Sequence, residues 1–327
     1  MKTMVMFLLA ATLFLLVLSC NGAQEPTPEL HVGILIPEKT RTESNVIKGL
    51  KKGLKELGYI EGKNILISVL SAEGNRGALE SMARKFVSRK VNLIVTTGTR
   101  ATKVAEASAS EIPIVFIHPA NPEVLGLVKS MTRPGGNVTG VAALSLQMTG
   151  KRLEIIKEIV PKLRQVLIYY DANNRYSRKN FAFAQKAAEK LGLEVADHPI
   201  KSVDELMDTI GSIQKSQGKA LFHIPDDLVE SRIDSIFETA RKKRLPTMSY
   251  EELWVTKGGL ASYGPSYFQM GRQAAGLVDK ILKGQRPQDL PVERAIKFDL
   301  TINFRAASIM GLTIPPAVLK RADMVIR

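Results

Sequence analysis

The stretch LHVGILI, residues 30–36, has the form of a buried β-strand, because apolar residues fill most of its positions. A helical stripe follows at residues 45–57, with apolar side chains three or four positions apart, and Gly58 ends it. A second short apolar run, residues 65–69, predicts the next strand. The chain thus opens with a strand, a helix and a strand, the unit from which parallel sheets are built.

The same alternation continues along most of the chain. Further strands are predicted at residues 92–96, 114–118, 165–170, 194–199, 220–224 and 247–249. Further helices are predicted at residues 77–88, 99–107, 150–159, 178–191, 203–214 and 228–243. Strict alternation implies parallel strands covered by helices on both faces, with ligands bound at the carboxyl ends of the strands. We expect an α/β protein of two doubly wound parallel-sheet lobes.

The blocks 30–142 and 143–262 are each long enough for one lobe. The residues after 262 are too few for a third domain, so we expect them to complete both lobes. Residues from about 263 to 292 would join lobe 1, and residues from about 293 to 327 would join lobe 2. Several crossings between the lobes would form a hinge, and ligands favour the cleft between two such lobes.

The first 29 residues predict where the protein is located. Residues 1–19 begin with the basic Lys2, continue in an apolar run and end in a small residue, as signal peptides do. The single cysteine, Cys20, follows directly, and VLSC at 17–20 resembles a bacterial lipobox, whose cysteine receives lipid. The alternative is an ordinary signal peptide with a chance cysteine. We interpret residues 20–29 as a lipidated tether that holds the protein at a membrane surface outside the cytoplasm.

Composition excludes several classes of protein. The 327 residues are 45% hydrophobic and 24% charged, which suits about two folded domains. The net charge of +14 is spread over many segments without a nucleic-acid-binding motif, so we interpret it as a solvated surface. One cysteine and four histidines without metal-binding spacing argue against a metal site. With no GxSxG motif and no nucleotide P-loop, we predict no catalytic residue, cofactor or metal.

Several short motifs stand in a fixed order along the chain. They are TTGT at 96–99, IPIVF at 112–116, RPGGNVTG at 133–140, GKRLE at 150–154, SYGP at 262–265, KILKG at 280–284, DLPVE at 289–293 and GLTIPP at 311–316. Their order and spacing resemble the ABC-transporter substrate-binding proteins of the tryptophan/tyrosine-type group, which have a type I periplasmic-binding-protein fold. The resemblance implies a protein that captures a small solute for a membrane permease. We expect a monomer that binds no nucleic acid.

Candidate ligand contacts in lobe 1 follow its third and fourth strands. Thr97 and Thr99 lie where a strand ends and a helix begins, and the free N–H groups there favour a carboxylate. For Thr99, capping of the helix is an equally good interpretation. His118 and Asn121 follow the next strand, where each side chain either faces the cleft or caps a turn. Some members of the group carry Asp-Pro where this chain has Asn121-Pro122.

Candidate contacts in lobe 2 also follow strands. Asp226 and Asp227 come after strand 220–224, and we assign Asp227 as the helix cap and Asp226 as the carboxylate for a cationic group. Polar and aromatic side chains at other strand ends complete this wall: Asn173, Tyr176, Tyr250 and Tyr263. For Asn173 and Tyr176, a polar surface turn is the alternative.

An anion site opposite a carboxylate suits a zwitterion, so an amino acid or a close relative is the predicted ligand. We therefore predict an extracytoplasmic solute-binding lipoprotein of an ABC importer that closes its lobes around the ligand. One alternative is a sensory module with the same lobes that signals to a membrane receptor. Another is an extracytoplasmic enzyme, for which the sequence offers no nucleophile–base pair.

Overall fold

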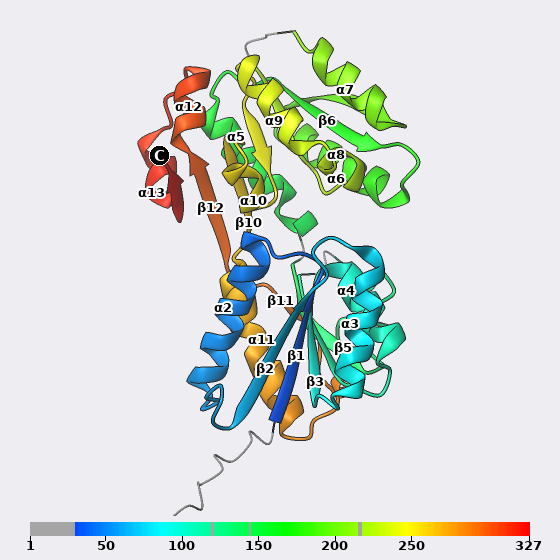
Figure 1. Ribbon diagram of the computed structural model, residues 1–327. Helices are drawn as coiled ribbons and strands as arrows, with labels where there is room; N and C mark the ends of the chain where they lie inside the picture. The colour runs from blue at the N-terminus through cyan, green and yellow to red at the C-terminus, as the bar shows by residue number, and fades with distance from the viewer. Residues whose placement is uncertain (1–29, 119–120, 144, 215–217) are drawn as a thin grey trace, which may run out of the picture.

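The computed structural model describes residues 30–118, 121–143, 145–214 and 218–327, which form two sheets with helices on both faces (Figure 1). The predicted α/β class with two sheet-centred lobes is confirmed. The predicted signal peptide, Cys20 and the tether lie outside the described residues. Within the described ranges, no helix has the length and apolar character needed to cross a bilayer.

The first sheet is parallel throughout, with strand order β11-β5-β4-β3-β1-β2. Its strands are β1 (Leu30–Ile36), β2 (Ile65–Ser71), β3 (Leu93–Thr97), β4 (Ile114–Ile117), β5 (Val138–Ala142) and β11 (Glu293–Arg294). Helices α2 (Arg41–Glu56) and α11 (Tyr267–Leu282) cover one face, and α3 (Arg76–Ser88) and α4 (Gly98–Ser108) cover the other.

The second sheet has strand order β13-β12-β10-β9-β8-β6-β7. Its strands are β6 (Gln165–Asp171), β7 (Glu194–Ile200), β8 (Lys219–Phe222), β9 (Thr247–Ser249), β10 (Ala261–Pro265), β12 (Phe298–Asn303) and β13 (Met324–Ile326). One face packs against α5 (Thr149–Ile159), α6 (Arg175–Lys190), α12 (Phe304–Met310) and α13 (Pro316–Arg321). The other face packs against α7 (Val203–Ser212), α8 (Asp227–Glu230), α9 (Ile233–Lys242) and α10 (Glu252–Thr256).

One strand pair of the second sheet is antiparallel, contrary to the prediction of purely parallel sheets. Strand β10 ends at the hinge, and β12 begins there, with Pro265 paired to Phe298. A chain that leaves a sheet at one edge and re-enters it at the same edge must run in the opposite direction. The antiparallel pair is therefore a consequence of the hinge crossings.

The crossings lie slightly later in the chain than predicted. Residues 263–265 pair within the second sheet, and residues 293–294 pair with β5 in the first sheet. The chain therefore crosses near residue 266 and again at 295–297, after an earlier crossing that follows Ala142. The short helix η1 (Ser145–Met148) follows the first of these connections, whereas η2 (Pro287–Asp289) lies at the amino ends of the first sheet.

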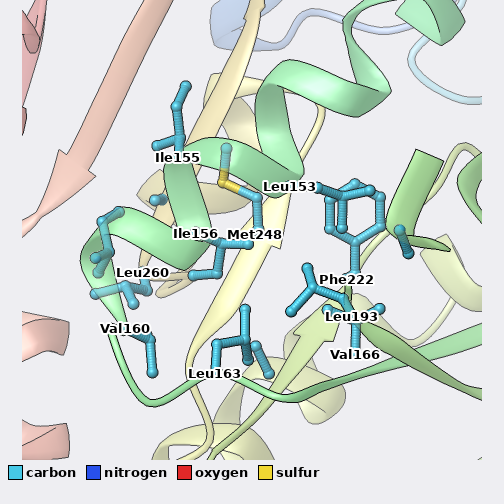
Figure 2. Packing of buried hydrophobic residues seen from close by; sticks show 14 of the residues in the cluster. Leu153, Ile155, Ile156, Val160, Leu163, Val166, Leu193, Phe222, Met248 and Leu260 are labelled. Carbon is cyan, nitrogen blue, oxygen red and sulfur yellow. The ribbon is translucent and has the colours of Figure 1, made fainter. Parts of the chain in front are cut away.

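Alternating side chains of the strands build a core on each face of each sheet. Along β1, Ile34 packs toward α2 and α11, whereas Leu35 packs toward α3 and α4. In lobe 2, α5 buries Leu153 and Ile156 against Phe222 and Met248 of the sheet (Figure 2). Burial of apolar surface on both faces is the main stabilising contribution to each lobe.

Helices α2 and α11 approach each other through glycines. A Cβ atom on Gly49 would lie 1.9 Å from the Phe268 carbonyl oxygen, and a Cβ atom on Gly271 would lie 2.0 Å from that of Val46. Only glycine permits this backbone contact. The two helices therefore form one tight unit, whose N-terminal ends, Arg41 and Tyr267, reach lobe 2.

The predicted helix at 228–243 is wrong, because the segment forms two helices, α8 and α9. Arg232, the residue before α9, has φ −128° and ψ 19°, which lies outside the helical region. The break places Glu230, the last residue of α8, at the carboxyl end of the second sheet.

Candidate functional site

The carboxyl ends of the two sheets face each other across the junction between the lobes (Figure 1). Several contacts between described residues join them. Thr42 Oγ1 donates to Glu251 Oε1 at 2.9 Å, and Tyr176 donates its hydroxyl to the Val124 carbonyl oxygen at 2.9 Å. An ion pair of 2.8 Å links Arg41 to Glu252. A separate pocket of about 290 Å³ beside Leu30, Asn92 and Pro113 lies at the amino ends of the first sheet, away from this junction.

A chain of polar groups crosses the junction from Glu251. Tyr267, the first residue of α11, lies beside Glu251, and its hydroxyl lies 3.0 Å from His118 Nε2. Burial raises the pKa of Glu251 to about 7 and lowers the pKa of His118 to about 4. His118 is therefore a neutral imidazole at pH 7. Its φ of 86° is rare for a residue other than glycine, and such strain is characteristic of functional sites.

A fully buried arginine, Arg152 of α5, lies beside the junction. Its Nη2 donates to the Ser145 carbonyl at 2.6 Å and to the Ser145 hydroxyl at 2.7 Å, and its Nε donates to the Tyr263 carbonyl at 2.8 Å. Its guanidinium also lies 6.0 Å from the Tyr250 ring centroid. Because Ser145 and Tyr263 border two different hinge crossings, Arg152 ties these crossings together.

Glu230 and Tyr250 form a second polar cluster in lobe 2. Tyr250 donates its hydroxyl to Glu230 Oε1 at 2.5 Å, and burial raises the pKa of Glu230 to about 8. His223 lies behind them, with its ring 5.2 Å from Tyr250 and 5.7 Å from Trp254 between centroids. Burial lowers the pKa of His223 to about 3, so this imidazole is neutral.

Two buried hydroxyls lie at opposite sheet edges without partners. In the described part of the chain, neither Thr97 Oγ1 nor Ser249 Oγ has a hydrogen-bond partner. Thr97 ends β3 in lobe 1, and Ser249 ends β9 in lobe 2. Buried polar atoms without partners are uncommon in folded proteins, and a bound ligand or water can satisfy them. The same described residues contain no group of three or more potential metal ligands arranged around one point.

The family model of ABC transporter substrate binding proteins matches residues 31–326. This chain belongs to that family. A tyrosine-binding protein of Clostridioides difficile is 31% identical over 259 residues, which cover 78% of this chain and 73% of that relative. The resemblance inferred from the motifs is thus confirmed. Substrate-binding proteins of this family act outside the cytoplasm, bind small molecules and work with membrane permeases, and the family is not one of enzymes.

Two solved structures are also similar to this substrate-binding protein. An ABC domain of Streptococcus pneumoniae in complex with L-Trp is 26% identical, with a TM-score of 0.76 over 91% of this chain and 99% of that one. The ligand-free, open structure of a Clostridium difficile substrate-binding protein with adhesive properties is also 26% identical. Its TM-score is 0.77 over 91% of this chain and 99% of that one.

Several predicted contacts of this substrate-binding protein lie at the junction. Thr97 and His118 stand at strand ends of lobe 1, Tyr250 stands at the matching edge of lobe 2, and Tyr176 bridges the lobes. Thr97 occupies the N-cap position of α4, so the alternative that Thr99 caps this helix is wrong. Thr99 lies in the first turn of α4. Contact between these residues and a ligand stays a prediction.

Other predicted contacts have partners within one lobe. Asn121 accepts a bond from the Val124 amide at 3.2 Å, as a turn residue does. Asn173 is exposed, and its backbone amide donates to Asp171 Oδ1 at 2.8 Å. The Tyr263 ring stacks on Phe298 within lobe 2, 6.0 Å between centroids.

The assignment of Asp227 as the helix cap was wrong, because Asp226 holds that position. Asp226 is the N-cap of α8, where Oδ1 accepts from the Val229 amide at 2.9 Å and Oδ2 from the Asp171 amide at 2.7 Å. Asp227 is exposed in the first turn. Because both oxygens of Asp226 bond to the backbone of its own lobe, its carboxylate is a structural cap. Carboxyl groups at the junction include those of Glu43, Glu230, Glu251 and Glu252, which the sequence analysis missed.

Proposed function

We propose that this protein is the extracytoplasmic solute receptor of an ABC importer and that it binds an aromatic amino acid between its lobes. The proposal rests on the opposed carboxyl ends of the two sheets. They present buried tyrosines and hydroxyls that lack a hydrogen-bond partner among the described residues. Tyr250 and Tyr267 offer aromatic surface from either lobe, and Thr97 and Ser249 offer hydroxyls. Two relatives support the ligand class, because one is named for tyrosine binding and the other holds L-Trp.

Closure of the lobes is the proposed mechanism. A ligand that contacts both sheet edges binds the closed arrangement more tightly than the open one, so it shifts the population toward closure. The three hinge crossings permit such a rotation, because they are short and lie side by side at one end of the lobes. A permease would then recognise the closed form.

Calorimetric titration with tyrosine, tryptophan and phenylalanine tests the ligand class, with leucine and glucose as controls. We expect at least one aromatic amino acid to bind, and at 100 times its dissociation constant to stabilise the fold by about 2.7 kcal/mol. Binding of glucose but of no aromatic amino acid would contradict the proposal.

We also propose that Cys20 carries lipid and that residues 20–29 tether the receptor to the membrane. The support is the position of the only cysteine after an apolar run and a small residue. The change Cys20→Ala should abolish incorporation of labelled palmitate in a bacterial host. Unchanged labelling in this variant would show that the lipid is attached elsewhere.

A further inference from the structure

Glu230 is a carboxylate at the lobe junction that lacks a basic partner. Within the described residues, no lysine or arginine nitrogen lies within 4.0 Å of its carboxyl group. Among the same described residues, one histidine nitrogen lies within 4.0 Å, His223 Nε2 at 3.9 Å, and this imidazole is neutral at pH 7. The guanidinium of Arg152 bonds to Ser145 and Tyr263 instead.

Hydrogen bonds from described residues hold Oε1 of the Glu230 carboxyl group and do not involve Oε2. The Tyr250 hydroxyl donates to Oε1 at 2.5 Å, and the Asp226 amide donates to the same atom at 3.2 Å. The side chain keeps 23% of its surface exposed, although the residues around it are buried. The carboxyl group is therefore fixed in orientation and still accessible.

The surroundings of Glu230 favour a cation. The titratable groups that face it are Tyr250, Glu251 and His223 from neighbouring elements, together with Asp226 and Asp227 from its own segment. Three of these are acidic, and none carries a positive charge at pH 7. A carboxylate in such a position gains most from a cationic partner supplied from outside the chain.

We propose that Glu230 binds the ammonium group of the ligand and that the ligand is therefore a primary amine whose apolar part packs near Tyr250. This assignment rests on the proposed function and takes the role that the sequence analysis gave to Asp226. Tyr250 contributes to binding of both the ammonium group and the apolar part of the ligand, because its hydroxyl orients Glu230 and its ring provides apolar surface.

Binding of an amine has a second consequence at Glu230. Because burial raises the pKa of this carboxyl to about 8, it is largely protonated at pH 7 before the ligand arrives. An ammonium ion at hydrogen-bond distance favours the ionised form, so binding releases about one proton. A glutamate with a purely structural role would show no such release.

Calorimetry at pH 7 in phosphate and in Tris measures both affinity and proton release, because the two buffers differ in ionisation enthalpy. The ligands are tyrosine and 3-(4-hydroxyphenyl)propionate, which lacks the amine. The variant Glu230→Gln keeps one acceptor oxygen for the Tyr250 hydroxyl and the Asp226 amide but removes the charge, and Asp227→Asn is the matched control on the same helix. We expect Glu230→Gln to lose tyrosine affinity by about 30-fold or more, to lose most of the proton release and to bind the amine-free analogue unchanged.

Unchanged tyrosine affinity and proton release in Glu230→Gln would overturn the assignment. If that variant does not fold, the wild-type protein still decides, because equal proton release with tyrosine and with the amine-free analogue contradicts a role for the amine. If the wild-type protein binds no aromatic amino acid, the proposed function fails. The role of Glu230 is then tested with tyramine, tryptamine and lysine. An amine that binds the wild-type protein but not Glu230→Gln supports the assignment. If the wild-type protein binds none of these amines, the assignment is overturned.

Discussion

Thr42 and Glu251 join the two lobes through one buried hydrogen bond, 2.9 Å from Thr42 Oγ1 to Glu251 Oε1. Thr42 lies in the first turn of α2 in lobe 1, and Glu251 precedes α10 in lobe 2. Tyr267 of lobe 1 lies beside the same carboxyl group. This carboxyl group is thus one of the points at which the two lobes are held together.

Removal of the Thr42 hydroxyl should favour the open arrangement. Thr42→Val keeps the shape of the side chain and removes one hydrogen bond that exists only when the lobes touch. We expect the free energy of lobe closure to become less favourable by about 1 kcal/mol, which weakens ligand affinity roughly fivefold. Solution scattering should show a larger radius of gyration for this variant.

The matched control is Thr139→Val, because Thr139 donates to the Leu290 carbonyl at 2.8 Å within lobe 1. It should reduce stability without a change in the radius of gyration. Equal radii for wild type and Thr42→Val would mean that the bond contributes nothing to closure.

The contact between α2 and α11 should not tolerate a methyl group. Gly271→Ala places a Cβ atom 2.0 Å from the Val46 carbonyl oxygen, so the helices must separate. We expect a loss of about 1–3 kcal/mol in the free energy of unfolding, measured by chemical denaturation. Gly276→Ala on the same helix meets no atom within 4 Å and should be neutral or stabilising. Similar losses for both variants would point to a cause other than the helix contact.

The fold was predictable where it depends on apolar periodicity. The strand at 30–36 and the helix after it are found nearly at the predicted positions, because one buried face sets both patterns. The direction of β12 was not predictable in this way. It depends on where the chain crosses the hinge, and the local sequence does not encode that position.

The site was predictable only in part. Thr97, His118 and Tyr250 were found because they follow strands, and topology brings strand ends together. Arg152 was missed as a site residue, although it shares the buried helical stripe of Leu153 and Ile156, where a charged side chain is unusual. Glu230 was missed because its position depends on the break between α8 and α9, which the helical pattern does not show.

The role of Asp226 as the cap of α8 leads to a prediction about stability. Asp226→Ala removes two charge-assisted bonds to backbone amides and should destabilise lobe 2 by about 2–4 kcal/mol. Asp227→Ala should change stability by less than about 0.5 kcal/mol, because Asp227 is exposed. Denaturation curves of the two variants compare them directly, and a larger loss for Asp227→Ala would restore the original assignment.

Stability should fall as the pH rises from 6.5 to 8. The pKa of Glu251 is raised to about 7 and that of Glu230 to about 8, both chiefly by burial. The folded state therefore binds more protons than the unfolded state between pH 4.5 and 8, and stability from these groups is lost as the pH rises through 7 and 8. Below pH 6.5, the depressed pKa values of His118 and His223 act in the opposite sense, because unfolding there takes up protons.

The window above pH 6.5 is the one in which Glu230 and Glu251 change protonation in the folded state. The expected loss there is about 2 kcal/mol, or roughly 5 °C in melting temperature, for the ligand-free protein at constant ionic strength. Scanning calorimetry at four pH values measures it. The double variant Glu230→Gln, Glu251→Gln should flatten the slope, because neither amide titrates, whereas the exposed control Glu111→Gln should leave it unchanged. An equally steep slope in the double variant would assign the pH dependence to other groups and would contradict the raised pKa of Glu230, on which the predicted proton release depends.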